Sequence, residues 1–496
     1  MRFIQSNKKN FLIKYISVVL LLIFYWIVNY TFQSNSFSNY NLESKIYILN
    51  WIGILIFLYA IITWRILTGK IFTPYTIFFL FLFLFSFGQC LMWALGIHSP
   101  NEIGKAYTAE RFIITQEVII KSQIYTCLAM FSFHVGALFC FKHNFEKKSF
   151  SKIRLKLTNK AIWSVGCFLC IISIPSTLFR AYKFFHVAYN YGYSSLYYSE
   201  NISQGGITMI LEMFFMPALI CLLIGSNYGK KSKIFVYTIF AIYLLLNLLS
   251  GDRGSWIYKT IVLIWLSHTY NKKIPRNKFI KYAVISIICI YILSIIMKFR
   301  DLGMGQVTLE QFKQAFIMKD SPIIDVIFEM GGSMGIISLL IVTSNVNGMW
   351  TYGNTYLNAI FGVVSTRLLT LFNIPFILVD DWFSKNYMGL SWGMGFSMVG
   401  ESYLNGGIYF GPIITFFLGI IIGSILYIDV YIDKHNKPIK ILFISTSLST
   451  LIGLSRGTIY LYLKTWFYGT VVVCCCIYFI ALYLNKHMKD SNIELK

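Results

Sequence analysis

The sequence predicts an all-α polytopic membrane protein with about twelve transmembrane helices and one large external loop. Hydrophobic residues make up 57% of its 496 positions and charged residues only 13%, too few to cover the surface of a soluble protein of this length. The apolar residues form continuous runs of about 20, the length at which a helix crosses the hydrocarbon core of a bilayer. They do not alternate with polar residues, as they would in a transmembrane β-barrel.

The apolar runs predict the position of each span. The first run, residues 11–28, is longer than the h-region of a signal peptide and no small-residue cleavage site follows it, so we expect a retained helix. The predicted spans cover residues 11–31, 45–66, 71–97, 119–141, 161–182, 207–225, 234–250, 254–270, 279–299, 407–429, 439–456 and 464–485. They divide the chain into residues 1–299 with spans and short loops, a large external loop at 300–406 containing short helices, and residues 407–496 with the last spans and a tail.

The formal net charge of +23 is explained by the loops on one side of the membrane. With the N-terminus inside, most Lys and Arg residues fall in short cytoplasmic segments such as residues 142–160, as the positive-inside rule describes. Both termini are therefore expected in the cytoplasm, and the basic composition does not indicate nucleic-acid binding. No cytoplasmic segment is long enough for a catalytic domain, and the chain has no P-loop and no metal-ligand spacing of His, Cys or Asp.

Arginines gather on the external side of this threading. Arg180, Arg253, Arg300 and Arg456 fall at the external ends of spans, and Arg367 lies in the large loop. Each arginine taken alone could be an interfacial anchor, because its side chain can snorkel to the headgroups. Several on one face, in a chain that uses Lys elsewhere, favour a phosphate or pyrophosphate site, because the guanidinium fork matches phosphate oxygens in pairs.

The stretch LLSGDRGSWIYK places Asp252 beside Arg253, between two glycines. Asp252 either orients Arg253 through a salt bridge or caps the helix expected to begin at Ser255.

A second polar cluster lies in FSMVGESYLNGGIYFGP, residues 396–412. Glu401 stands just before the predicted span at 407, between Gly400 and an Asn-Gly-Gly turn. A carboxylate in a partly apolar, outward-facing pocket can serve as a general base. The alternative is an interfacial Glu paired with a neighbouring Arg. Tyr403 and Asn405, in the same segment, are further candidates for substrate contact.

Three features together resemble the O-antigen polysaccharide polymerases of the Wzy type. They are SGDRGSW, the long external loop that opens after KFRD, and GESYLNGGIYFG leading into a span; the resemblance runs from about residue 250 to 460. It implies a GT-C-like glycosyltransferase of the bacterial inner membrane, working at the periplasmic face on oligosaccharide units carried by undecaprenyl pyrophosphate. It implies neither a nucleotide sugar nor a metal cofactor. A separate chain-length-regulating co-polymerase and the membrane lipids are the implied partners.

The resemblance also implies roles for the candidate residues. The leaving group is a pyrophosphate, so Arg253 and Arg456, and then Arg300 and Arg367, would stabilise its charge. Glu401 would remove the proton of the acceptor hydroxyl. The expected catalytic residues are thus Glu401, Arg253 and Arg456, and the expected substrate-binding residues are Asp252, Arg300, Arg367, Arg180, Tyr403 and Asn405.

Other membrane activities remain as alternatives. An O-antigen ligase would be expected to use a His in its large periplasmic loop, but residues 300–406 contain none; His98 and His186 are the external candidates, and His134 lies inside a span. A flippase for the lipid-linked unit fits the many spans and basic character, but not the long loop or the missing two-half repeat. A membrane acyltransferase would need a His-centred motif, which we do not find.

Overall fold

A computed structural model describes most of the chain. The described residues are 2–33, 42–103, 113–141, 155–197, 207–252, 254–271, 322–347, 354–373, 378–390, 395–427 and 437–493, with isolated positions between 274 and 310 and at 376 and 393. Every regular element in these ranges is helical. The chain forms two compact units. Unit 1 comprises Met1–Lys147, Ile327–Val430 and Leu451–Lys464, and unit 2 comprises Lys148–Val326, Tyr431–Thr450 and Thr465–Lys496.

Within the described residues, ten helical stretches are long and apolar enough to cross a membrane; twelve spans were predicted for the whole chain. They are Asn10–Tyr30, Leu42–Thr68, Pro74–Ala94, Gln116–Leu138, Thr158–Tyr191, Ile207–Gly225, Lys230–Leu249, Val326–Thr343, Met398–Leu426 and Ile459–Lys486. Nine of these coincide with predicted spans. The protein is therefore an all-α, multi-pass membrane protein.

The three other predicted spans have different outcomes. At 254–270, helix α9 (Ser255–Leu266) continues into a π-helical stretch, Ser267–Asn271. The helix therefore covers nearly the predicted residues, but it is not among the ten candidate spans. At 439–456, helix α18 (Pro438–Leu454) has 17 residues and is a shorter apolar helix. The predicted span at 279–299 lies largely outside the described residues.

The tenth candidate span, Val326–Thr343, lies inside the region predicted as a large loop. It consists of the end of α12 (Pro322–Met330) and most of α13 (Ser333–Asn347), joined by a turn at Gly331 and Gly332. The sequence predicted two short helices because the glycine pair interrupts the apolar run. The interruption is a two-residue turn, so the two helices together reach the length of a span.

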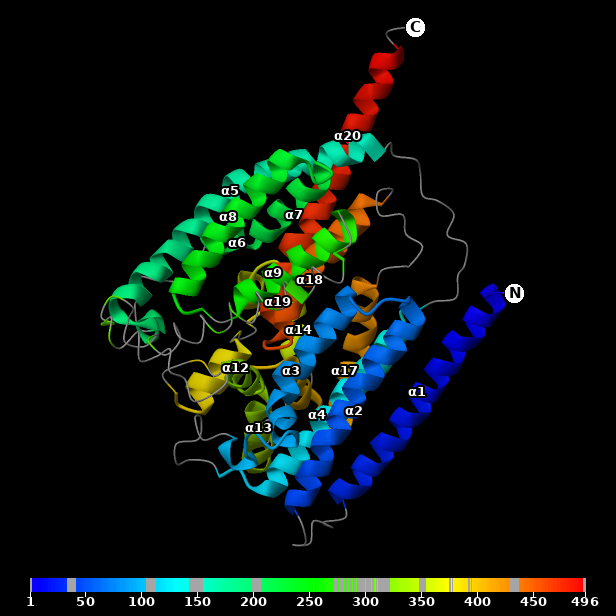
Figure 1. Ribbon diagram of the computed structural model, residues 1–496, viewed down its shortest axis with the longest axis vertical. Helices are drawn as coiled ribbons and strands as arrows, with labels where there is room; N and C mark the ends of the chain where they lie inside the picture. The colour runs from blue at the N-terminus through cyan, green and yellow to red at the C-terminus, as the bar shows by residue number, and fades with distance from the viewer. Residues whose placement is uncertain are drawn as a thin grey trace. The chain divides into compact units, whose positions relative to one another are not determined.

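Helix α4 (Gln116–Leu138) lies at the centre of unit 1. It contacts α1 (Arg2–Gln33), α2 (Leu42–Thr68), α13 and α17 (Met398–Leu426). Of the residues in its most apolar 18-residue stretch, 89% are buried. Helix α3 (Pro74–Ala94) begins with a capping box at Thr73 and Pro74 at its first position, and it lies beside α2 and α4 (Figure 1).

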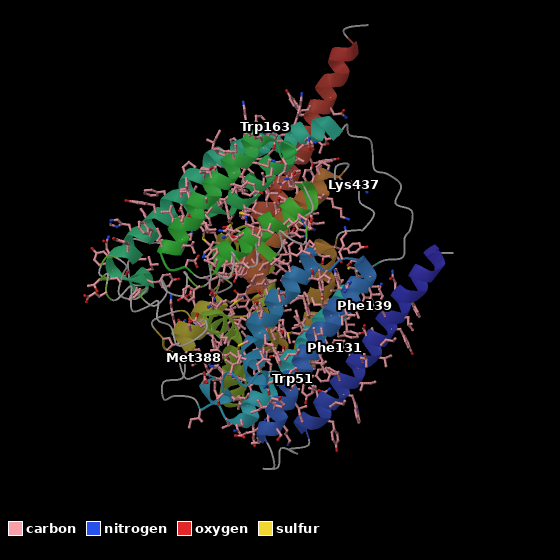
Figure 2. All side chains as sticks on the ribbon, viewed as in Figure 1. Trp51, Phe131, Phe139, Trp163, Met388 and Lys437 are labelled. Atoms are coloured by element: carbon pink, nitrogen blue, oxygen red, sulfur yellow. The ribbon has the colours of Figure 1, made fainter. Side chains whose placement is uncertain are left out.

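Small residues allow α4 and α17 to approach closely. A Cβ atom added at Gly419 of α17 would lie 2.0 Å from the carbonyl oxygen of Phe133 in α4. Gly423 follows four residues later and faces Ala137, so the two form the small-xxx-small pattern that packs membrane helices. At the end of α4, the ring of Phe139, labelled in Figure 2, packs edge-to-face on Phe416 at 5.6 Å.

A buried histidine joins three helices in this core. The Nε2 atom of His134 lies 2.8 Å from the Thr63 hydroxyl of α2, and its Nδ1 atom lies 2.8 Å from the Tyr75 hydroxyl of α3. Both ring nitrogens therefore have partners inside the helix bundle. His134 has a structural environment, in agreement with its predicted position inside a span.

Unit 2 is organised around the long helix α5 (Leu155–Tyr191). It contacts α6 (Ile207–Met213), α7 (Phe215–Gly225), α8 (Lys230–Leu249) and the C-terminal helix α20 (Val473–Ile493). The closest approach involves Gly225 of α7, where an added Cβ would lie 2.5 Å from the backbone nitrogen of Trp163, a residue labelled in Figure 2.

Helix α17 is interrupted at a glycine. Gly407 has φ 61° and ψ −158°, a conformation that essentially only glycine adopts, and it separates residues 398–406 from residues 408–426. Ser397 caps the first segment by accepting a hydrogen bond of 2.9 Å from the Gly400 N–H. The sequence predicted that a span starts at 407, with residues 398–406 in the preceding loop. Those residues are helical, and the predicted boundary corresponds to the break.

Candidate active site around Glu401 and Arg456

Two segments that the sequence singled out meet at Glu401 in unit 1. The Glu401 side chain is 1% exposed. Its Oε2 atom accepts a hydrogen bond of 2.7 Å from the backbone N–H of Ile459, the first residue of α19 (Ile459–Trp466). Ile459 follows Arg456 by three residues, so this contact joins the GESYLNGG segment to the SRG segment.

A third segment completes the surroundings of the carboxylate. Thr355, in the first turn of α14 (Asn354–Gly362), donates a hydrogen bond of 2.9 Å from its hydroxyl to Glu401 Oε1. The Asn405 side-chain amide donates to the Thr355 hydroxyl at 2.6 Å and to the Glu401 carbonyl at 2.8 Å. Thr355 N–H in turn donates to Asn405 Oδ1 at 3.4 Å. Asn405, predicted to bind substrate, thus holds α14 against α17.

The local sequence explains why Glu401 lies at this junction. The Ser397 cap starts α17, which places Glu401 in its first turn, and α19 begins at Ile459. The first N–H groups of a helix have no partner within the helix and carry the positive end of its dipole. A carboxylate therefore interacts favourably with both helix ends. The sequence left open that Glu401 pairs with a neighbouring Arg. Its partners in the structure are instead a hydroxyl and a backbone N–H.

Arg456 lies in the turn between α18 and α19. Consecutive hydrogen bonds from Ser455, Arg456 and Gly457 N–H groups to carbonyls three residues earlier form this turn. The Tyr462 ring lies across both glycines of GLSRG, so that a Cβ at Gly453 or Gly457 would come within 2.2 Å of the ring. The Arg456 side chain is exposed, and its guanidinium lies 5.7 Å from the Phe85 ring centre. Among the described residues it forms no ion pair.

Tyr403 follows Glu401 by two residues but is turned into the helix packing. Its side chain is 7% exposed and packs edge-to-face on the Tyr125 ring of α4 at 4.8 Å. The Tyr125 hydroxyl lies 2.8 Å from the Ser402 hydroxyl. Tyr403 therefore joins α17 to α4, and its ring supports the site from within the core.

Sequence reasoning missed a second carboxylate near Glu401. Asp380 lies in the short helix α16 (Val379–Asp381), and its charge acts on both Glu401 and Tyr462. Burial, and to a smaller extent the charge of Asp381, raise the pKa of Asp380 above its ordinary value. Aromatic contacts hold the segment on both sides: Phe376 packs on Tyr460 at 4.5 Å, and Phe383 on Phe396 at 5.7 Å. The acidic pair in FILVDDW was a signal, because only 20 residues of the chain are acidic.

Sequence reasoning also missed Thr355 and Tyr356. Both lie in α14, and neither belongs to a motif that would distinguish it among the many polar residues of the 300–406 region. Thr355 is important because it contacts Glu401 and Asn405, 46 and 50 positions away in the chain, and Tyr356 because the charge of Glu401 acts on it.

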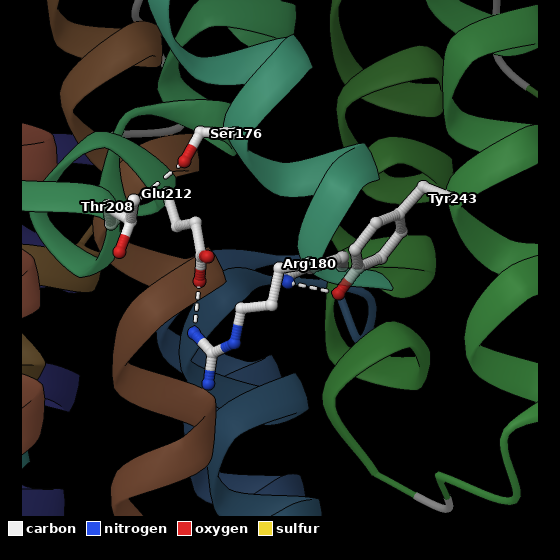
Figure 3. A network of polar contacts seen from close by, with 6 residues as sticks. Ser176, Arg180, Thr208, Glu212 and Tyr243 are labelled. Atoms are coloured by element: carbon white, nitrogen blue, oxygen red, sulfur yellow. Dashed lines mark hydrogen bonds and ion pairs between the residues drawn. The ribbon is translucent and has the colours of Figure 1, made fainter. Parts of the chain in front are cut away.

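Arg180, predicted to bind substrate, is paired inside unit 2. Its guanidinium forms an ion pair with Glu212 of α6 (Figure 3). The guanidinium also lies 4.9 Å from the Phe184 ring centre. The Ser176 hydroxyl, one turn earlier, donates to the Thr208 carbonyl at 3.4 Å. Glu212 is only 16% exposed. The two contacts join α5 to α6, and the arginine charge is neutralised there.

The remaining candidates lie elsewhere in the chain. The Asp252 carboxylate accepts a hydrogen bond of 3.1 Å from the Gly254 N–H, which forms a local turn just before α9 begins at Ser255. This contact lies close to the predicted cap, but Gly254 itself is the N-cap residue. Arg253 and Arg300 lie outside the described residues. Arg367 is exposed on α15 (Thr366–Leu371) of unit 1.

Helix α17, the first turn of α14 and the start of α19 thus meet at Glu401. Arg456, whose side chain is exposed, lies in the turn directly before α19. A family model of the O-antigen polysaccharide polymerase Wzy matches residues 7–488, nearly the whole chain. Neither the curated proteins nor the solved structures gave a match. The family match confirms the resemblance and decides against the ligase, flippase and acyltransferase alternatives. The chain belongs to the O-antigen polysaccharide polymerase Wzy family, membrane glycosyltransferases that polymerise lipid-linked repeat units.

Proposed function

We propose that this polymerase joins oligosaccharide units carried by undecaprenyl pyrophosphate, and that the reaction takes place at Glu401 and Arg456. The growing chain leaves its lipid pyrophosphate and is transferred to a hydroxyl at the non-reducing end of the next lipid-linked unit. The bond between the anomeric carbon and the pyrophosphate oxygen breaks, and the pyrophosphate keeps the electron pair. A glycosidic bond forms to the acceptor oxygen, whose proton must be removed.

The observation that carries this proposal is the position of Glu401, a buried carboxylate with neutral partners. Each of its oxygens accepts one hydrogen bond, from Thr355 and from the Ile459 N–H, and each keeps a further acceptor site. Glu401 can therefore take the proton of the acceptor hydroxyl. Because the side chain is 1% exposed, its surroundings must open before the acceptor hydroxyl can reach it.

Arg456 supplies the positive charge at the other side of the reacting bond. Its exposed guanidinium can form two parallel hydrogen bonds to phosphate oxygens and stabilise the charge that develops on the leaving pyrophosphate. The resemblance extends the same role to Arg253, Arg300 and Arg367.

The orientation of the chain follows from the distribution of basic residues. We place both termini in the cytoplasm and the 300–406 region, with Glu401, at the periplasmic face of the inner membrane. The many spans and the lipid-linked donor are consistent with a glycosyltransferase of GT-C type. A co-polymerase that sets chain length would act with it.

The test is the surface polysaccharide of a strain that lacks this protein, separated as a ladder on a gel. A single repeat unit on the lipid core is expected, and the wild-type gene should restore the ladder. Glu401→Gln keeps the size of the side chain but lowers its basicity, so it should leave the single unit. Its one carbonyl oxygen can still accept from the Ile459 N–H, and its NH2 group can donate to the Thr355 hydroxyl. Glu43→Gln, an exposed acid in the first turn of α2, is the matched control and should restore the ladder.

Two results would contradict the proposal. A normal ladder with Glu401→Gln, at equal amounts of inserted protein, would exclude Glu401 as the base. Accumulation of single lipid-linked units on the cytoplasmic face of the deletion strain would point to a transport step instead of polymerisation.

A further inference from the structure

The hydroxyl of Tyr356 is buried and has no hydrogen-bond partner among the described residues. Tyr356 is the third residue of α14, directly after Thr355. A buried polar group without a partner costs free energy, so native proteins seldom keep one without a reason. A hydroxyl in this state next to a reaction centre is well suited to bind a substrate group that arrives later.

Tyr356 lies beside the Glu401 carboxylate. Burial is the main cause that raises the pKa of Tyr356 well above its ordinary value, and the charges of Glu401 and Tyr125 add to it. The hydrogen bond from Thr355 to Glu401, 2.9 Å long, fixes the first turn of α14 at the same place. The nearby Tyr125 hydroxyl is already bonded to Ser402 at 2.8 Å. The phenol of Tyr356 and the carboxylate of Glu401 therefore belong to one small polar region of unit 1.

The chemistry of this region selects the kind of group that fits. A sugar hydroxyl can donate its proton towards the carboxylate and accept a hydrogen bond from the phenol at the same time. A phosphate oxygen placed beside Glu401 would be repelled by the charge of the carboxylate. We propose that the Tyr356 hydroxyl binds the acceptor sugar, donating a hydrogen bond that holds the reacting hydroxyl next to Glu401. This inference rests on the proposed function, because it takes Glu401 as the base.

A single-transfer assay with the full-length protein in lipid nanodiscs tests this inference. The donor is a repeat unit on undecaprenyl pyrophosphate whose acceptor hydroxyl is methylated, so that it cannot accept. The acceptor is the same repeat unit on a non-cleavable alkyl chain, so that it cannot donate. The Michaelis constants of donor and acceptor can then be measured separately.

Tyr356→Phe removes only the hydroxyl. The acceptor KM should rise about two- to tenfold, the range expected for one hydrogen bond, while the donor KM stays unchanged. The thermal stability of the free protein should stay the same or increase, because an unsatisfied buried hydroxyl has been removed. A residue with a merely structural role would show the opposite change in stability.

The matched control is Tyr75→Phe, a buried tyrosine of the same unit whose hydroxyl lies 2.8 Å from His134 Nδ1. This variant should lose thermal stability and keep the acceptor KM. An unchanged acceptor KM in Tyr356→Phe, or a rise in the donor KM instead, would overturn the inference. Glu401→Gln in the same assay separates the two hypotheses. If it abolishes transfer while Tyr356→Phe has no effect, only the role of Tyr356 is wrong; if it transfers normally, the Glu401 centre itself is wrong.

Discussion

Glu401 and Arg180 are both charged residues within apolar helices, and their partners differ in charge. Glu401 is bonded to a hydroxyl and a backbone N–H, so its negative charge is stabilised without being neutralised. Arg180 is paired with Glu212, which neutralises it. Arg456 is exposed and forms no ion pair within the described part of the chain. Of these three residues, Glu401 and Arg456 are therefore the two whose charge no oppositely charged side chain neutralises in the described part of the chain.

Arg456→Lys tests the role of the guanidinium. Lysine keeps the positive charge but not the planar fork, so the polymerisation rate of the purified protein should fall by about tenfold or more. Arg65→Lys, an exposed arginine in the last turn of α2, is the control and should retain the wild-type rate. Wild-type polymerisation by Arg456→Lys would show that a point charge suffices and that no paired contact to phosphate is formed.

Arg180 should contribute to stability instead of catalysis. Arg180→Gln leaves the Glu212 charge in a mostly buried position and should lower the free energy of unfolding by about 1–3 kcal/mol. The double variant Arg180→Gln with Glu212→Gln should recover most of that loss, as read from thermal unfolding in detergent. If the single variant keeps its stability but loses polymerisation, Arg180 contacts substrate as the sequence suggested.

At the scale of the elements, the α4–α17 contact and the break at Gly407 determine where Glu401 lies. The glycines at 419 and 423 allow residues 408–426 to lie directly against α4. Gly407 then lets the chain change direction, so that residues 398–406 form a separate short helix that presents Glu401 to α14 and α19. The position of the carboxylate thus depends on packing that takes place several turns away.

Gly419→Val tests this dependence. The new side chain would meet the Phe133 carbonyl, which an added Cβ already approaches to 2.0 Å. We therefore expect the free energy of unfolding to fall by about 1–3 kcal/mol or more. The readout is the melting temperature of the purified protein together with its polymerisation rate. Gly393→Val is the control, since an added Cβ there meets nothing within 4 Å. Equal melting temperatures for the two variants would contradict the close packing of α4 and α17.

At the scale of the whole molecule, the central question is which side of the membrane carries the 300–406 region. The candidate span Val326–Thr343 lies within this region and, if it crosses the bilayer, places its two flanks on opposite sides. The proposed function requires the residues around Glu401 to face the periplasm, where the acceptor unit is.

Cysteine labelling on both sides of Val326–Thr343 answers this question. Thr308→Cys and Lys385→Cys replace exposed residues before and after it. We expect both to react with an impermeant thiol reagent in intact cells with a permeabilised outer membrane, above the background of the unsubstituted protein. Labelling at 308 alone would mean that Val326–Thr343 crosses the membrane, and no labelling at 385 would contradict a periplasmic Glu401.

The sequence by itself determined the fold class, most spans and the two segments that form the candidate site. These features are local: a run such as residues 207–225 is apolar and long enough whatever its neighbours are, and Ile207–Gly225 is indeed a candidate span. Glu401 and Arg456 were visible because a charge within an apolar run is costly and therefore conspicuous. The family resemblance depended on the same segments, and the match over residues 7–488 confirms it.

Only the tertiary structure decided which of these residues meet. Glu401 contacts Thr355, 46 positions away, and Ile459, 58 positions away. Arg180 contacts Glu212, 32 positions away. Such contacts depend on how helices pack against each other, which the apolar pattern of each helix does not encode. The same reason explains why Asp380 and Tyr356 were missed and why Arg180 was taken for a substrate contact. Local hydrophobicity determines where the helices run, and side-chain packing between them determines the site.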